Sequence, residues 1–186
     1  MYMNMKKKTQ SGFTIIELMV VVAVAAALAV FAVPNLTVMV KNNRIATQAN
    51  DLVGAMNIAR SEAVKRALQA NVCARATDTS CAAANATDWS NGWIVYLDTN
   101  LAAGNTLGVL DAGDTILRVR EPLTGNNTMT SSDGVISYRA SGFSTLATGS
   151  TQSFVLCDDR GNQFGRIITV LNTGRTNMQK TTDQCS

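Results

Sequence analysis

Histidine is absent from this chain of 186 residues, and it has only two prolines and 5% aromatic residues. Without histidine the chain lacks the usual general base of nucleophilic triads and metalloprotease sites. It also contains no Gly-rich phosphate loop and no Gly-x-Ser-x-Gly elbow. Adjacent Asp158 and Asp159 would point to opposite faces of a strand, which argues against joint acid–base work. We therefore expect a protein that is not an enzyme and has neither catalytic residues nor a cofactor.

Charge is scarce as well, at 16% of residues with a formal net charge of +3. The three lysines at positions 6–8 account for that excess, so it is poor evidence for nucleic-acid binding. Zinc is disfavoured because the cysteines form no Cys-x-x-Cys pair. Four residues resemble a calcium loop but lack its glycine and bidentate glutamate, so we expect turn residues and no metal. They are Asp98, Asn100, Asp111 and Asp114.

The four cysteines are Cys73, Cys81, Cys157 and Cys185. An even number predicts two disulfides formed in an oxidising compartment. Four cysteines allow three pairings. We favour Cys73 with Cys81 and Cys157 with Cys185, because each pair is nearest in sequence and closes a short loop.

A long apolar run dominates the N-terminal part of the chain. Residues 1–12 are polar and basic, and from Phe13 to position 33 only Thr14 and Glu17 interrupt the apolar residues. This is about the length of a transmembrane helix, and the positive-inside rule keeps the basic flank in the cytoplasm. A secretory signal peptide is the alternative, but its shorter apolar region precedes a small-residue cleavage site. Here the small residue, Gly12, comes before the run.

The helical pattern continues beyond the apolar run and then stops. From position 35 to about 70, apolar residues recur at steps of three and four, which predicts an amphipathic helix. Pro34 removes a backbone donor and clashes with the preceding turn, so we expect a kink or a locally melted stretch near residues 30–34.

Short β-like runs between turn clusters fill the remainder of the chain. Their spacing predicts an antiparallel sheet, and the alternation within 115–120 suggests one wet face. The Asn-, Asp-, Thr-, Ser- and Gly-rich segments between the runs, among them 85–91, 98–114 and 124–133, read as loops. The expected fold class is α+β. The predicted strands are 92–97, 115–120, 134–140, 152–157 and 166–171.

The residues at positions 6–18, Lys-Lys-Lys-Thr-Gln-Ser-Gly-Phe-Thr-Ile-Ile-Glu-Leu, resemble the processing signal of type IV prepilins and type II secretion pseudopilins. The resemblance implies cleavage after Gly12 by a prepilin peptidase and N-methylation of Phe13. It also implies a type IV pilin-like fold, in which a long N-terminal helix packs on a C-terminal antiparallel β-sheet domain. The implied parts are a leader (1–12), a transmembrane and filament-core helix (13–34), an amphipathic helix (35–70) and a β-rich head (71–186).

Glu17 is the unusual residue of this segment. A carboxylate inside an apolar helix costs a few kcal/mol unless it is paired or sheltered in a bundle. The resemblance to type IV prepilins implies that the partner of Glu17 is the amino terminus of a neighbouring subunit. Glu17 is therefore an expected assembly residue. The alternative is that Glu17 lies near the membrane interface and is solvated.

Several further segments resemble the group of minor pilins that contains FimU, FimT and the pseudopilin GspH, with FimU the most similar. They are Ala-Arg-Ser-Glu-Ala-Val-Lys-Arg at 59–66, Asp-Trp-Ser-Asn-Gly-Trp-Ile-Val-Tyr-Leu-Asp at 88–98, Leu-Cys-Asp-Asp-Arg-Gly at 156–161 and Gly-Arg at 174–175. We expect Trp89 and Trp93 to be core or sheet-packing residues rather than ligand-binding ones. We expect Arg60, Glu62 and Lys65 to form a solvated helix face with weak ion pairs.

The resemblance implies a structural subunit at the tip of the type IV pilus that helps initiate assembly. Its implied partners are other major and minor pilins, the prepilin peptidase, the inner-membrane assembly platform and membrane lipid. It would be a single-pass inner-membrane protein with a periplasmic head, and would then join the filament, at its tip.

Two alternatives remain open, a FimT-like DNA-binding minor pilin for natural transformation and a GspH-like pseudopilin of type II secretion. FimT-type proteins are associated with a Gly-Arg-x-Arg motif, whereas this chain has Gly-Arg-Thr-Asn at 174–177. Residues 160–180 contain no acidic residue, and basic side chains there would contact phosphates without reading bases. The possible DNA contacts are Arg160, Arg166, Arg175 and Lys180.

Overall fold

In the computed structural model, residues 12–99, 108–180 and 184–185 are described. The chain divides into two compact units, Met1–Val40 and Lys41–Ser186. The expected basic leader at positions 1–11 lies outside the described residues, and the division into leader, filament helix, amphipathic helix and head remains a prediction. The long helix α1 (Ile15–Arg66) contributes residues to both units.

The described part of the first unit is helix with a short N-terminal lead. Thr14 caps α1, because the backbone N–H of Glu17 donates to Thr14 Oγ1 at 3.3 Å and that of Leu18 donates to the Thr14 carbonyl at 3.2 Å. All the described side chains between positions 13 and 40 are exposed. This unit therefore buries none of its described apolar side chains by itself.

Hydropathy and length identify no single helix in the described chain as a membrane span, although Ile15–Val30 and Asn35–Arg66 qualify together as a bent pair. The backbone at position 34 is helical, and α1 is assigned without interruption from Ile15 to Arg66. The break expected at Pro34 therefore stays a prediction.

In the second unit, α1 presents one buried stripe of side chains. The residues recur every three or four positions and are fully buried, as an amphipathic helix requires. The helix ends at Arg66, four residues earlier than its apolar periodicity predicts. Ala67 adopts a left-handed conformation with φ 53°, and position 69 already pairs with a strand, so tertiary pairing overrides helix propensity here. The stripe comprises Ile45, Ala49, Leu52, Ala55, Met56, Ala59 and Ala63.

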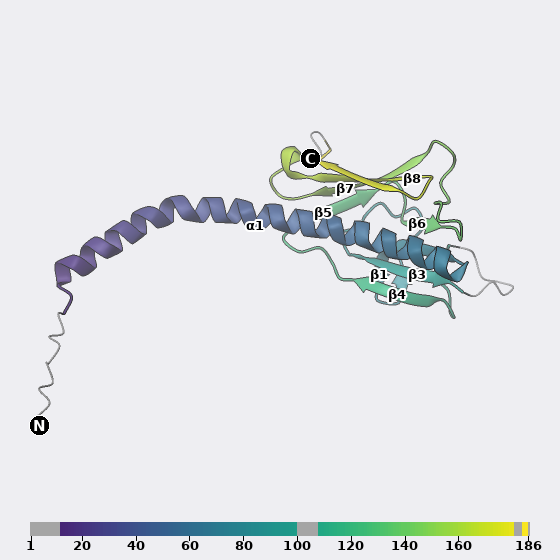
Figure 1. The fold of residues 1–186 in the computed structure, drawn as a ribbon, viewed down its shortest axis with the longest axis horizontal. Helices are drawn as coiled ribbons and strands as arrows, with labels where there is room; N and C mark the ends of the chain where they lie inside the picture. Colours follow the sequence, from purple (N-terminus) through teal and green to yellow (C-terminus); the bar gives the residue numbers. More distant parts are fainter. Residues whose placement is uncertain (1–11, 100–107, 181–183, 186) are drawn as a thin grey trace, which may run out of the picture. The chain divides into compact units, whose positions relative to one another are not determined.

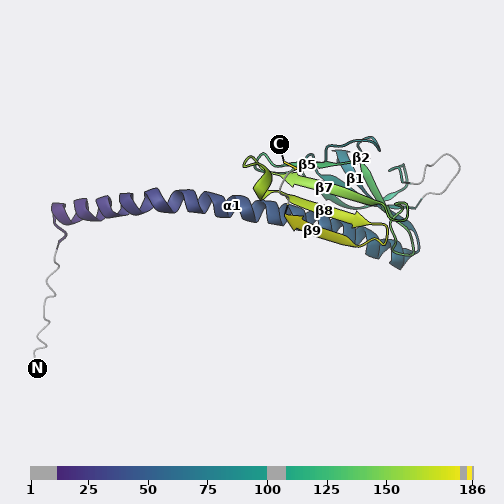
Figure 2. The same cartoon turned by 90° about the horizontal axis from the view of Figure 1, so that it is seen from above.

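Two antiparallel sheets share a core with this part of α1 (Figures 1 and 2). The first has the order β2-β1-β3-β4, with β6 paired to β1 on the side not taken by β3; the second has the order β5-β7-β8-β9. The first contains β1 (Gln69–Thr77), β2 (Ser80–Cys81), β3 (Trp93–Asp98), β4 (Thr115–Arg120) and β6 (Val135–Tyr138). The second contains β5 (Thr128–Ser131), β7 (Thr151–Cys157), β8 (Arg166–Leu171) and β9 (Thr176–Lys180). The α+β fold class, with a helix packed on antiparallel sheets, is thus confirmed.

All five predicted strands are present, and two of them, β4 and β8, have the predicted bounds. Four strands were not anticipated: β1, β2, β5 and β9. The strand β5 lies inside the expected loop 124–133, because its Thr-Met-Thr-Ser sequence is polar enough to read as a turn. The basic tail likewise contains an edge strand, β9, which pairs with β8.

The predicted wet face of β4 is wrong. The register between β3 and β4 shifts between Val95 and Tyr96, so Leu117 occupies a bulge and joins the main core. Ile116 and Val119 then pack on the opposite face, in a second cluster centred on Cys73, Ile94 and Tyr96. Both faces of this sheet are therefore partly covered.

Two disulfides connect the cysteines in the nearest-neighbour pairing. Cys73 in β1 is bonded to Cys81 in β2, and Cys157 at the end of β7 is bonded to Cys185. The second bridge ties Cys185, which is 3% exposed, to the C-terminal end of β7. The Cys157–Cys185 disulfide closes the longer loop, so it reduces the conformational entropy of the unfolded chain more than Cys73–Cys81 does.

Leu52 tests the shared core. Leu52→Ala removes a fully buried side chain from the helix stripe, and we expect a loss of about 2–5 kcal/mol in unfolding free energy. Val64→Ala on the same helix, where the side chain is 53% exposed, is the control and should change stability by about 0.5 kcal/mol or less. Urea unfolding of a fragment beginning at Lys41 measures both values. Equal values for the two variants would contradict the assignment of the stripe.

Candidate functional site

The processing and assembly residues lie at the start of the first unit. Gly12 and Phe13 are exposed and precede the first helical residue, and Glu17 is exposed in the first turn of α1. Their roles in cleavage, methylation and assembly stay predictions.

Arg60 in the second unit does not belong to a solvated face, and that expectation was wrong. Its Nε donates to the Gly142 carbonyl at 2.9 Å and its Nη2 donates to the Thr173 carbonyl at 3.3 Å. One guanidinium therefore clamps two loops onto α1. The neighbouring acid does fit the expectation, since Glu62 forms exposed ion pairs with Lys65 at 3.6 Å and Arg66 at 2.7 Å.

The Gly-Arg segment at 174–175 lies beside the same clamp. Gly174 has φ +75°, and a Cβ added there would lie 2.2 Å from the Gly142 carbonyl oxygen. Only glycine permits this approach between the two loops. The buried hydroxyl of Tyr138 lies near this region, and burial raises its pKa while the charge of Arg60 opposes that rise. The helix-end segment and the Gly-Arg segment thus meet as one structural site.

The turn after β7 is anchored to the first residues of the second unit. Asp158 is buried and accepts from Arg160 Nε at 2.7 Å, while Asp159 pairs with Lys41 Nζ at 2.7 Å. The hydrogen bond from Lys41 lowers the pKa of Asp159. Arg160 Nη1 also donates to Asn42 Oδ1 at 2.9 Å. The two acids therefore serve different ion pairs, as separate anchors of the turn.

Of the four predicted DNA contacts, two lie side by side. Arg166 and Lys180 are direct partners on β8 and β9, and both line a cavity of about 200 Å³ with Asn42, Gln163 and Phe164. The Arg160 guanidinium lies over the Phe164 ring at 4.1 Å, so it borders the cavity while bound to Asp158. Its charge is therefore already paired.

Arg175 lies elsewhere, in the turn between β8 and β9. The pairing of these strands runs from Arg166 opposite Lys180 to Val170 opposite Thr176, which puts Arg175 at the other end of the pair. The four predicted residues do not converge on one site. Sequence reasoning also missed the cavity residues Asn42 and Gln163, because nothing in their local pattern links positions so far apart in the chain.

The tryptophan segment serves the core, as predicted. Trp89 is fully buried, packs edge-on against Phe154 with ring centroids 4.8 Å apart, and donates its Nε1–H to the Asp133 carbonyl at 3.0 Å. Trp93 is 1% exposed, with Arg120 at 5.9 Å over its ring. Neither indole is available to a ligand.

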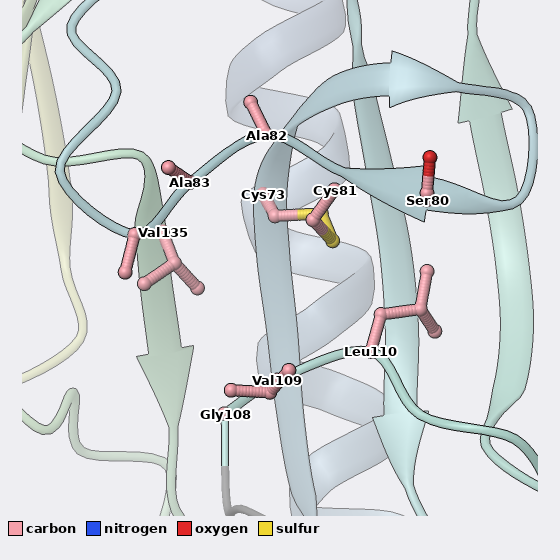
Figure 3. A pocket seen from close by; sticks show the side chains of 10 residues that line it. Cys73, Ser80, Cys81, Ala82, Ala83, Gly108, Val109, Leu110 and Val135 are labelled. Carbon is pink, nitrogen blue, oxygen red and sulfur yellow. A yellow bond between two sulfur atoms is a disulfide. The ribbon is translucent and has the colours of Figure 1, made fainter.

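A second, more apolar groove of about 220 Å³ lies beside the Cys73–Cys81 disulfide (Figure 3). Figure 3 shows Val109, Leu110 and Val135 around this bridge. The groove contains no charged side chain among its lining residues. Its lining therefore suits apolar packing rather than the binding of a charged ligand.

The prediction of turn residues in the acidic segment holds only in part, because Asp111 and Asp114 flank a turn at 112–113, whereas Asp98 is the last residue of β3. Asp98 accepts from the Gly108 N–H at 2.9 Å, and Asp114 accepts from the N–H groups of Thr99 and Asp111, each at 3.0 Å. Burial raises the pKa of Asp98. No cluster of three metal-ligating side chains occurs within residues 12–99, 108–180 and 184–185, and Asn100 lies outside those ranges.

Comparison with known proteins places these features in a family. A family model described as type II transport protein GspH matches residues 48–174, and a model of the prokaryotic N-terminal methylation motif matches residues 7–33. No curated protein sequence gives a significant match.

Two crystal structures of the type IV minor pilin FimU of Pseudomonas aeruginosa share the fold. One is 19% identical with a TM-score of 0.55, covering 77% of this chain and 95% of FimU. The other crystal form is 20% identical with a TM-score of 0.53, covering 75% and 97%. At these identities the likeness shows the fold alone.

Gly174→Ala tests the contact between the two clamped loops. Gly149 is the control, because it has a similar φ of +81° but open space around it. We expect Gly149→Ala to cost about 1–2 kcal/mol from the left-handed backbone alone. Gly174→Ala should cost about 1–3 kcal/mol more, because the added methyl group meets the Gly142 carbonyl. Equal midpoints for the two variants in urea unfolding would show that the close approach does not constrain the loops.

Proposed function

The chain belongs to the GspH family of type IV pilin-like proteins, and we propose that it is a minor pilin at the tip of a type IV pilus, where it helps initiate assembly. Family and fold are those of pilin structural proteins. The methylation motif and the fold together indicate a protein that is anchored in the membrane and then joins a filament.

One observation carries the proposal, namely the apolar helix that the first unit leaves uncovered. Side chains such as Ile15, Val24 and Leu28 are 55–82% exposed over this stretch. An exposed apolar surface of this extent needs lipid or other apolar helices around it. A pilin meets both requirements in turn, first in the bilayer and then in the filament core.

The order of events follows from the N-terminal residues. In this proposal the peptidase cleaves after Gly12, the new amine on Phe13 is methylated, and Glu17 pairs with the amine of a neighbouring subunit. A carboxylate in apolar surroundings gains a few kcal/mol from such a partner. The assembly platform and neighbouring pilins are the partners that this sequence of events requires.

The head supplies the identity of the subunit. A subunit used at a filament tip must distinguish its neighbours through exposed side chains rather than through a helix that resembles every other pilin helix. Edge strands of the second unit carry exposed side chains, among them β4 and β9, and such neighbours would pack beside them. Other major and minor pilins are the proposed partners there.

A pseudopilin of type II secretion is the second candidate, favoured by the description of the matched family model as a type II transport protein. The DNA-binding alternative has less support. Its expected contact Arg175 lies apart from Arg166 and Lys180, and Gly174 has a packing role.

Glu17→Ala tests the assembly step. We expect normal removal of the leader, because Gly12 and Phe13 are unchanged, but roughly tenfold less subunit in sheared filaments, because the buried charge pair is lost. Mass spectrometry of the mature N-terminus, expected to be a methylated Phe13, checks the processing. Glu62→Ala, which removes only exposed ion pairs in the head, is the control and should incorporate normally. Normal incorporation of Glu17→Ala would count against the pairing.

Deletion of the gene separates the two candidates. A tip-initiating minor pilin predicts strongly reduced surface piliation with secretion intact, whereas a pseudopilin predicts the converse. Quantifying surface pili and secreted enzymes in the same deletion strain measures both. Undiminished piliation would rule out the minor-pilin assignment, and re-expression of the wild-type chain is the control for polar effects.

A further inference from the structure

We propose that the cavity lined by Asn42, Gln163, Phe164, Arg166 and Lys180 binds the phosphate of an anionic lipid in the membrane that holds the unassembled subunit. We call it the β8–β9 cavity. It lies within the second unit, and the pairing of neighbouring pilins does not require it. The inference rests on the proposed membrane anchoring of the unassembled subunit, but not on the proposed role at the filament tip.

Two cations face each other at the β8–β9 cavity. Arg166 and Lys180 are paired across adjacent strands, which keeps their side chains close. Arg166 Nη1 donates to the carbonyls of Phe164 at 3.3 Å and Gly165 at 3.0 Å, and these bonds fix the orientation of the guanidinium. A guanidinium held in this way, with an ammonium beside it, suits a phosphate group.

Among the residues that the structure describes, none cancels the positive charge of the cavity. No acidic residue lines it, and neither Arg166 nor Lys180 takes part in an ion pair within the described chain. The other cations nearby are already neutralised, Lys41 by Asp159 and Arg160 by Asp158. The two strand cations therefore supply the local charge.

Neutral side chains complete the lining. The amide oxygen of Asn42 accepts from Arg160 Nη1 at 2.9 Å, and this bond fixes which way its amide group points. Amide N–H groups such as those of Asn42 and Gln163 are suitable donors for phosphate oxygens. Phe164 is held in place by the Arg160 guanidinium at 4.1 Å. A volume of about 200 Å³ accommodates one phosphate with part of its substituent.

The chain itself favours a lipid phosphate over nucleic acid. Asn42 follows Val33, the last residue of the apolar run, by nine residues, which span about 30 Å at most even when fully extended. The cavity is therefore tethered close to the headgroups while the apolar run is in the bilayer. A nucleic-acid strand needs a continuous basic track, and Arg175 lies at the other end of the strand pair.

Native mass spectrometry of the full chain, released from nanodiscs, tests the proposal. The nanodiscs contain phosphatidylglycerol mixed with phosphatidylcholine. We expect the wild-type chain to retain phosphatidylglycerol in preference to phosphatidylcholine. The double variant Arg166→Gln, Lys180→Gln should reduce that preference on the order of tenfold. The matched control is Arg118→Gln, Arg139→Gln, which removes the same charge from exposed side chains elsewhere in the second unit and should behave as wild type.

Each other result would overturn the assignment. Equal phosphatidylglycerol retention by the wild type and the cavity variant would show that the cavity does not bind lipid. An equal loss in both double variants would show a general charge effect. A short single-stranded DNA that binds the full chain through Arg166 and Lys180, with lipid retention unaffected, would assign the cavity to nucleic acid instead. Circular dichroism of every variant confirms that the fold is kept.

Discussion

Burial of one stripe of α1 by both sheets is the interaction on which the second unit depends. The stripe is rich in alanine, with Ala49, Ala55, Ala59 and Ala63 fully buried. These small side chains share the core with the larger Leu52 and Met56 and with residues of both sheets. Because β1 and β3 of one sheet and β7 and β8 of the other pack against the same stripe, neither sheet has a complete core without the helix.

Hydrogen bonds and an ion pair from α1 hold the loops that the apolar core does not fix. Arg60 bonds the carbonyls of two loops at one end of the helix segment, and Lys41 and Asn42 hold the turn after β7 at the other end. Each clamp satisfies carbonyls or carboxylates that would otherwise lose hydrogen bonds. The segments that resemble minor pilins, at 59–66, 156–161 and 174–175, supply many of these groups. In this chain they therefore hold the head together.

The sequence predicted the structure best where a short-range residue pattern determined the secondary structure. The apolar run, the helix period and the β-branched strands β4 and β8 each follow a short-range pattern, and all were predicted. The strands β5 and β9 were missed because their polar residues resemble turns or a tail. The bulge opposite Tyr96 and the clamp by Arg60 depend on partners many positions away, as does the joining of Asn42 to Lys180 in one cavity. No local pattern encodes such contacts.

The two units divide the requirements of a filament subunit between them. The first unit offers an apolar helix whose chemistry, one acid in a run of aliphatic side chains, suits any pilin helix bundle. Such a surface gives assembly but no discrimination among partners. The family-like residues of the head cannot supply discrimination either, because Trp89, Trp93 and Gly174 are buried. In the proposed role, recognition is therefore left to the exposed side chains between those scaffold positions, on strands such as β4 and β9 and on the loops that Arg60 holds.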